Sequence, residues 1–285
     1  MYTLKKPTPK VVDVLAKCAG AIKDTDLINR LNAIQTAIQA NETLYDNYAD
    51  KSKLNLITQH TTLGSVTEEE LKSLYKDHLS ANRGSARAVY DAIKNAAPNN
   101  LCPLCSIGAV AHIDHHLPKS RYPDLSIMPL NLVPACHFCN HNKRDRFPRT
   151  EGEQTFHPYY DKHLLEQQWI KAKIHYGSPL VIVFSVAPPT SWSSTDQQRV
   201  DSHFKICGLG TVFKTQANTE LTSLKRHLQT LYDKGGPTQV QACLEEARDR
   251  YNIKLNSWQY VFYQTLAADH QFVNGGFTQI AGPQP

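Results

Sequence analysis

The sequence of 285 residues is 41% hydrophobic, carries 31 Lys and Arg against 26 Asp and Glu, and has a formal net charge of +5. This composition can supply a substantial core and argues against a wholly disordered chain, while the net charge alone is weak evidence for a nucleic-acid partner. No run of about 18 apolar residues is present, and prolines interrupt the N-terminal segment where a signal peptide needs an apolar run. We therefore expect a soluble, cytoplasmic protein with no membrane partner.

Helical periodicity dominates the first part of the chain. Apolar residues recur at helical spacing between residues 10 and 48, and the simplest interpretation is two helices. Thr67 and Glu70 form a capping box that begins a helix reaching to about residue 79. A further helix is predicted over residues 85–96, where it ends before the sequence APNN.

The segment from residue 98 to residue 150 has a different composition, because seven prolines leave room only for short elements. We expect a strand over about residues 109–116 and a short helix that begins near residue 137. Beyond this segment the sequence predicts, in order, a helix over 159–174, a buried strand over 180–186, and helices at about 195–207, 212–233, 238–251 and 256–269.

The expected fold class is mainly α, with helical flanks around a small irregular core. We divide the chain into an N-terminal helical region at 1–97, a cysteine-rich core at 98–150 and a mainly helical C-terminal region at 151–285. The sequence shows no internal repeat and no low-complexity linker.

Cysteine usage indicates metal binding rather than disulfides. Seven is an odd number, and four of the seven form two C-x-x-C pairs separated by thirty residues, Cys102 with Cys105 and Cys136 with Cys139. Two such pairs can supply four thiolates to one tetrahedral Zn2+ ion, which then has no open coordination position and stabilises the fold instead of catalysing a reaction. The alternative, four unrelated core cysteines, would have to produce this double spacing by chance.

The sequences IDHHLPKS and PLNLVPACHFCNHNK lie between and beside the cysteine pairs. The ordered set comprises C-x-x-C, then Asp-His with a proline three residues after the histidine, then Asn-Leu, then a second C-x-x-C followed by Asn and Lys. Over about residues 100–147 this set resembles the HNH endonuclease family. The resemblance implies a ββα-metal finger with its first strand at about 109–116 and its helix at about 137–145, so the helical flanks would enclose a zinc-stabilised HNH nuclease core.

The resemblance also implies roles for individual residues. Asp114 would be a ligand of a catalytic divalent ion, His115 the general base that activates water, and Asn131 the residue that braces the loop and orients the base. Asn140 would be the second protein ligand of the ion, so the motif is H-N-N rather than a literal H-N-H. Oxygen ligands favour Mg2+ or Mn2+ as the catalytic cofactor. Histidine suits the deprotonation of water near neutral pH, because its ordinary pKa is about 6.5.

Two adjacent histidines compete for the role of base. His115 follows Asp114 and precedes Pro118 by three residues, as in the family pattern. His116 should face the other side of the strand, because neighbouring side chains in a strand point to opposite faces. His141, on the expected helix, is a weaker candidate for contact with metal or phosphate.

Basic residues gather in the same window. Cations beside the scissile phosphate give affinity without reading sequence, so we expect phosphate contacts from Lys119, Arg121, Lys143 and Arg144. A solvated charged surface is the alternative interpretation of these four side chains.

The sequence thus predicts a metal-dependent HNH endonuclease that hydrolyses phosphodiester bonds, in DNA more than in RNA. The rival interpretation is a catalytically silent zinc module that binds nucleic acid or a protein. Helical flanks around an HNH finger also resemble the nuclease subunits of prokaryotic anti-phage systems, including those encoded beside an ATPase. About 135 residues follow the core without a catalytic motif of their own. We therefore expect a protein partner, such as an ATPase subunit, or self-association through the helices after residue 155.

Overall fold

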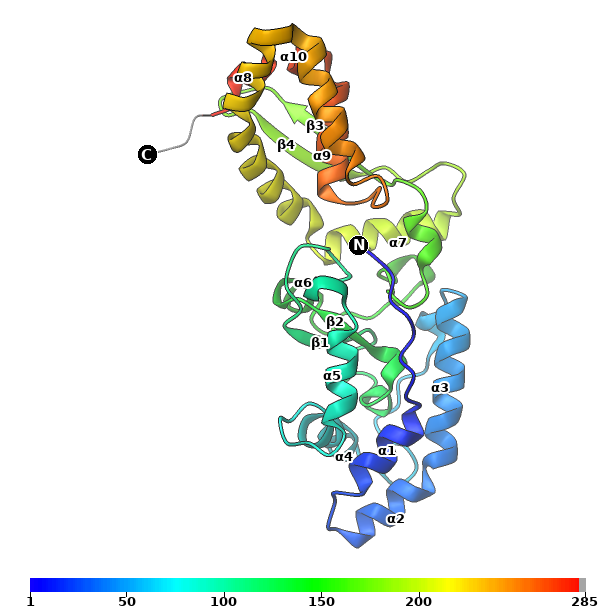
Figure 1. The fold of residues 1–285 in the computed structure, drawn as a ribbon. Coiled ribbons are helices and arrows are strands. Elements are labelled where there is room, and N and C mark those ends of the chain that lie inside the picture. The colour runs from blue at the N-terminus through cyan, green and yellow to red at the C-terminus, as the bar shows by residue number, and fades with distance from the viewer. Residues whose placement is uncertain (282–285) are drawn as a thin grey trace. The chain divides into compact units, whose positions relative to one another are not determined.

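The computed structural model describes residues 1–281, which form two compact units (Figure 1). The N-terminal unit is residues 2–162, and the C-terminal unit is residues 163–281 together with Met1. Helices make up most of the regular structure in this range, as the mainly α prediction states. No helix between residues 1 and 281 is both long enough and apolar enough to cross a membrane. The two units differ from the three predicted regions, because the first helices and the cysteine-rich segment bury a common core.

The helices of the N-terminal unit are α1 (Val11–Ala19), α2 (Thr25–Ala33), α3 (Gln35–Asp50), α4 (Glu68–Ser73), α5 (Arg87–Asn95) and α6 (His137–Lys143). Three helices replace the two predicted before residue 50, because Ile34 leaves the helical conformation between α2 and α3. The capping box of α4 is confirmed: the Thr67 hydroxyl accepts from the Glu70 N–H, and the Glu70 carboxylate accepts from the Thr67 N–H. A π-helical turn at Leu74–Leu79 continues α4.

A ββα unit follows these helices along the chain. Strands β1 (His112–His115) and β2 (Leu132–Ala135) pair antiparallel, with His115 opposite Leu132, and α6 begins directly after β2. Both β1 and α6 are shorter than the predicted strand at 109–116 and helix at 137–145. The strands are joined by residues 116–131, a long loop that contains two short 3-10 turns.

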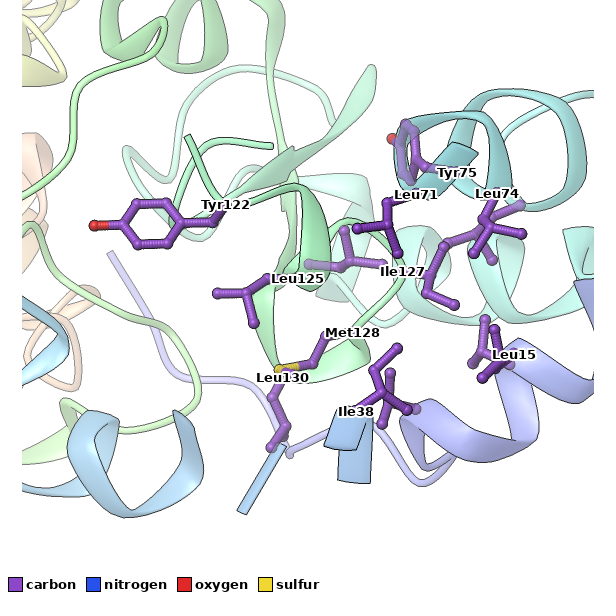
Figure 2. Packing of buried hydrophobic residues seen from close by; sticks show 14 of the residues in the cluster. Leu15, Ile38, Leu71, Leu74, Tyr75, Tyr122, Leu125, Ile127, Met128 and Leu130 are labelled. Atoms are coloured by element: carbon purple, nitrogen blue, oxygen red, sulfur yellow. The ribbon is translucent and has the colours of Figure 1, made fainter. Parts of the chain in front are cut away.

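Side chains of this loop pack into the helical core (Figure 2). Ile127, Met128 and Leu130 of the loop lie in one cluster with Leu15 of α1 and Ile38 of α3, and none of the five is more than 6% exposed. Full burial of one such side chain contributes about 1.5–3 kcal/mol to stability. The cysteine-rich segment is therefore part of the helical core of the N-terminal unit.

The C-terminal unit packs a β-hairpin against helices. Strand β3 (Ile170–His175) lies along α9, and strand β4 (Val181–Val186) lies along α8. The helices of this unit are α7 (Ser194–Ile206), α8 (Leu209–Asp249), α9 (Trp258–Ala268) and α10 (His270–Val273). The predicted strand at 180–186 and the predicted helices near 195–207 and 256–269 are confirmed.

The helix predicted over residues 159–174 is wrong. Ile170 and Ile174 have a spacing of four that suits a helix, but buried and exposed residues also alternate here, and pairing with β4 selects the strand. The helices predicted at 212–233 and 238–251 correspond to the two helical parts of α8. This element is broken at Gly236, where a φ of 65° leaves the helical region directly before Pro237.

Candidate functional site

Four cysteines of the N-terminal unit converge on one buried point. The Sγ atoms of Cys102, Cys105, Cys136 and Cys139 all lie within 4.8 Å of one another, and the four residues are at most 4% exposed. A tetrahedral Zn2+ ion with Zn–S bonds of about 2.3 Å places its sulfur ligands about 3.8 Å apart. The distance between the sulfurs of Cys105 and Cys136 is 3.8 Å. The four thiols therefore have the chemistry and the spacing of a structural zinc site.

Two tight turns bring these thiols together. In the first turn the Cys102 N–H donates to the Gly108 carbonyl at 2.8 Å, and the Ser106 N–H donates to the Cys102 carbonyl at 2.7 Å. In the second, Cys136 is the N-cap of α6, and its sulfur accepts from the Cys139 N–H at 3.4 Å. A Cβ on Gly108 would lie 2.7 Å from the Cβ of Cys136, so only glycine allows the two turns to approach this closely.

Hydrogen bonds among the four thiols favour the thiolate form of one cysteine, Cys105. Hydrogen bonds from Cys102 first, and then from Cys136 and Cys139, hold the pKa of Cys105 well below its ordinary value. The same hydrogen bonds, first that with Cys105, raise the pKa of Cys102, so the assignment of a metal site rests on the spacing of the four sulfurs.

Asp114 and Lys143 form a buried ion pair between β1 and α6. The Lys143 ammonium lies 3.0 Å and 3.3 Å from the two carboxylate oxygens of Asp114, and the two side chains are 5% and 7% exposed, respectively. The same ammonium donates to the backbone carbonyl of His115 at 2.7 Å. The structure thus places Lys143, predicted to contact a phosphate, inside the N-terminal unit and beside the predicted metal ligand.

His115 is held in one orientation at the end of β1. Its Nε2–H donates to the carbonyl oxygen of Ser126 at 2.8 Å, and Tyr75 packs edge-on against its ring with 4.4 Å between centroids. Burial, assisted by the positive charges of Lys119 and Lys143, lowers the pKa of His115 to about 3. The ring is therefore neutral at neutral pH, with its proton on Nε2 and a lone pair on Nδ1.

His116 has different neighbours from His115, as strand alternation predicts. The centroid of its ring lies 4.2 Å from that of His157, a residue of the segment that follows α6. Both His116 and His157 are buried. The two adjacent histidines therefore have separate surroundings. His115 lies beside Tyr75, and His116 lies in a polar cluster around His157.

Asn131 closes the loop between β1 and β2. Its Oδ1 accepts from the Leu117 N–H at 2.7 Å and from the Tyr45 hydroxyl at 3.2 Å. Its Nδ2 donates to the carbonyls of Leu117 at 3.0 Å and Leu125 at 3.3 Å. This fully buried amide therefore ties the end of the loop to its start at Leu117 and to its middle at Leu125.

The second predicted ligand, Asn140, is half-buried on α6 and precedes Lys143 by one helical turn. Within residues 1–281, the cysteine cluster is the only group of three or more His, Cys, Asp or Glu side chains arranged to hold a metal.

The other predicted phosphate contacts lie at or near the surface. The Lys119 ammonium is half-buried, 4.7 Å from the centroid of the Tyr75 ring, and burial lowers its pKa. Arg121 and Arg144 are exposed, and the Arg121 guanidinium lies 5.8 Å from the centroid of the Phe147 ring. These three cations remain accessible to an anion, in contrast to Lys143.

Sequence reasoning missed several polar residues that contact this site. Tyr45 of α3 bonds Asn131, Tyr75 packs on His115, and His157 packs on His116. Spacing within the motif could not indicate them, because Tyr45 and Tyr75 lie in the helical elements before β1 and His157 lies 14 residues after the last residue of α6. The sequence FHPYYD at 156–161 was the available signal, since it places a histidine and an aspartate among aromatic residues.

The fold and the site together define a mainly α protein with a ββα unit and a four-cysteine site suited to zinc. By sequence, the chain belongs to the same family as protein ea31 of Escherichia phage lambda. The two chains are 33% identical over 231 residues, which span 75% of this chain and 78% of the relative. No family model matches the chain, and no solved structure matches it significantly.

Proposed function

We propose that the protein is a metal-dependent endonuclease of the HNH type, which hydrolyses phosphodiester bonds in DNA in preference to RNA. The observation that carries this proposal is the state of His115. It follows Asp114 at the end of β1, and its hydrogen bond to Ser126 fixes the proton on Nε2. The remaining nitrogen, Nδ1, is then free to act as a base, which is the tautomer control that general-base histidines require.

The reaction assigned to His115 is proton removal from the attacking water. Nδ1 takes the proton while the water oxygen bonds to phosphorus, the bond from phosphorus to the leaving sugar oxygen breaks, and that oxygen takes up a proton from solvent. A divalent ion held by Asp114 and Asn140 would supply stabilisation of the negative charge that grows on the leaving oxygen. Asn131 keeps the loop, and with it the acceptor carbonyl of Ser126, in place.

Burial controls both the basicity of His115 and the access to it. A neutral ring is the form that can accept a proton, and a phosphate anion beside the ring would stabilise the protonated form and raise its low pKa. Tyr75 covers the ring, and Lys119 lies over Tyr75. Substrate entry therefore requires these two side chains to move, and Lys119 can exchange the aromatic ring for a phosphate when they do.

A zinc-stabilised binding module without catalysis is the second candidate, and one observation favours it. Asp114 is already paired with a buried ammonium, so a metal ion at this carboxylate has to compete with Lys143. Such a module would bind its partner through the exposed cations and would release no cleavage product.

Nuclease assays with single-site variants test the proposal. Purified protein is incubated with plasmid, single-stranded DNA and total RNA in Mg2+ or EDTA. We expect cleavage of DNA in Mg2+ only, and we expect His115→Ala to reduce the rate by about 10^2-fold or more, the contribution typical of a general base. His116→Ala is the matched control, and it should lose much less activity than His115→Ala, because the His116 ring packs against His157 and has no assigned part in proton transfer.

Two outcomes would contradict the assignment. Cleavage by His115→Ala at the wild-type rate, with His116→Ala inactive, would move the base by one residue and remove the role of Asp114. Absence of cleavage of every substrate by a folded, zinc-loaded wild-type protein would favour the binding module. Zinc content and circular dichroism of each variant separate loss of chemistry from loss of fold.

For the biological context we propose a role in the conflict between phages and bacteria, because the family includes a phage protein and the module resembles anti-phage nucleases. Association with a partner such as an ATPase subunit, or with a second copy, is part of this proposal. Size-exclusion chromatography with light scattering, with and without the products of neighbouring genes, measures it directly. A monomer under all these conditions would remove the partner from the proposal.

A further inference from the structure

The segment 156–161 and helix α3 contribute a buried polar chain that ends at the loop carrying the acceptor of His115. We propose that Tyr45 and His157 are positioning residues for His115 in the nuclease reaction, an inference that rests on the proposed function. Both residues belong to the N-terminal unit, both are buried, and neither lies in the ββα unit.

The orientation of the Asn131 amide is the first step of the argument. Its Nδ2 donates to two backbone carbonyls, those of Leu117 and Leu125, so the amide can adopt only one of its two orientations. Oδ1 is therefore the atom that faces Tyr45, and it can only accept. The single hydroxyl hydrogen of Tyr45 is accordingly directed at Asn131, across 3.2 Å.

The protonation of His157 follows from its own contacts. The backbone N–H of Tyr159 donates to His157 Nδ1 at 3.3 Å. A neutral imidazole that accepts at Nδ1 carries its proton on Nε2. Nε2 lies 3.1 Å from the Tyr45 oxygen, whose own hydrogen is directed at Asn131, so His157 donates to Tyr45. These contacts thus define one direction of donation, from His157 to Tyr45 to Asn131 and on to the loop carbonyls.

The end of this chain lies beside the group that orients the base. Leu125, whose carbonyl Asn131 holds, directly precedes Ser126, whose carbonyl accepts from His115 Nε2. Leu117, which Asn131 holds at both its N–H and its carbonyl, lies two residues after His115. A change in the Asn131 amide therefore displaces the backbone on both sides of the His115 ring. Buried hydrogen-bond chains transmit such changes because no water is present to replace a lost partner.

Tyr160 provides a matched control for Tyr45. Its ring also packs against His157, with 4.7 Å between centroids, but its hydroxyl donates to Asp46 on α3 at 2.8 Å instead of to a member of the chain that leads to Asn131. Tyr45→Phe and Tyr160→Phe each delete one hydroxyl from the same region of the unit. Only the first deletion interrupts the chain that leads to Asn131.

The kinetic test compares these two variants. We expect Tyr45→Phe to lower kcat about tenfold with KM within about twofold of wild type, because a misplaced base weakens the transition state more than substrate binding. Tyr160→Phe should keep kcat within about twofold. Zinc content and melting temperature are measured for both. Equal kcat values for the two variants would overturn the inference.

A second pair of variants tests the proton on His157. The amide nitrogen of glutamine can replace the Nε2–H donor of histidine, whereas asparagine is too short to reach Tyr45. We expect His157→Gln to retain most of the wild-type kcat and His157→Asn to resemble Tyr45→Phe. The reverse order would show that His157 acts through packing alone, and the inference would then fail.

A readout that does not depend on cleavage separates this inference from the proposed function. In protein labelled with 15N-histidine, the Nε2–H resonance of His115 reports its hydrogen bond to Ser126. It should shift in Tyr45→Phe and stay in place in Tyr160→Phe. A shift in a protein that cleaves no substrate would support the coupling and reject the nuclease. If the wild type cleaves DNA, but Tyr45→Phe changes neither the resonance nor kcat, the coupling is rejected and the proposed nuclease function stands.

Discussion

In the folded protein the ammonium of Lys143 contacts the carboxylate of Asp114 and the carbonyl of His115, where in the unfolded chain it would be hydrated. Desolvation of two charges is costly, and the pair is tolerated because each charge compensates the other. Removal of one partner therefore leaves an uncompensated charge in the interior, while removal of both does not. This asymmetry gives a test of the pair that requires no assumption about catalysis.

We expect Lys143→Met to lower the free energy of unfolding by about 3–5 kcal/mol, because the Asp114 carboxylate is left buried and unpaired. The double variant Lys143→Met with Asp114→Leu should regain most of this loss. Urea unfolding of the wild type, both single variants and the double variant measures the coupling between the two residues. A cost below about 1 kcal/mol for Lys143→Met would show that the pair is solvated in solution, like a surface ion pair.

A second buried carboxylate, Asp124, makes stability depend on pH. Its Oδ2 accepts from the Asn41 side chain at 2.9 Å, but its buried Oδ1 has no hydrogen-bond partner within the described residues. Burial raises the pKa of Asp124 to about 6. The folded state thus binds this proton more tightly than the unfolded state, so the contribution of Asp124 to stability decreases as pH rises from about 4 to about 6.

We therefore expect Asp124→Asn to be more stable than the wild type at pH 7.5, by up to about 3 kcal/mol, which is the equivalent of two pKa units. The difference should shrink to about 1 kcal/mol at pH 4.5, where the carboxyl is protonated in the folded state but still largely ionised in the unfolded state. Urea unfolding of the wild type and of Asp124→Asn at both pH values measures this difference. Effects of pH on the thiols are common to both proteins and cancel in the difference. A constant difference at the two pH values would show that Asp124 does not titrate in this range.

At the scale of elements, the turn at Gly108 lies so close to the start of α6 that a Cβ on this glycine would be 2.7 Å from the Cβ of Cys136. We expect Gly108→Ala to lower zinc content and melting temperature, because the new methyl group forces the two cysteine turns apart. Gly177→Ala is the control, since a Cβ there meets only the Pro179 carbonyl at 3.8 Å, an ordinary contact. Wild-type zinc content in both variants by elemental analysis would show that the two turns tolerate the methyl group, whereas a folded wild-type protein without zinc would remove zinc from the assignment of this site.

The elements of the site differ in how well sequence could predict them. The convergence of the four cysteines follows from the local spacing of the two C-x-x-C pairs, whereas the order of β1, β2 and α6 is what the resemblance to the HNH family implies. The contacts of Asn131 with Tyr45, and of His116 with His157, join residues 86 and 41 positions apart, and no local pattern records such pairings. The burial of Lys143 could not be predicted either, because the sequence shows that a cation is present but not whether it faces water or a carboxylate.

At the scale of the whole molecule, each compact unit has a core of its own, and the zinc site belongs to the N-terminal unit. Chelation of the metal should therefore increase hydrogen exchange first in β1, β2 and α6, because structural zinc contributes directly to folding free energy. Strands β3 and β4 and helix α8 should keep their protection. Hydrogen exchange with mass spectrometry measures both groups in one sample, and equal loss of protection in both units would contradict the prediction.

The packing of the loop at residues 116–131 against α1 and α3 also limits which segments of this chain can be exchanged with those of another protein. The segment 98–150 carries the whole sequence motif, yet on its own it would expose the side chains of Ile127, Met128 and Leu130 to water. The segment 98–150 is therefore not an independent module that can be transferred alone from one protein to another. Recombination within the gene would preserve the site only when the crossovers fall outside the codons for residues 2–162, so the helices before the motif and the motif itself are inherited together.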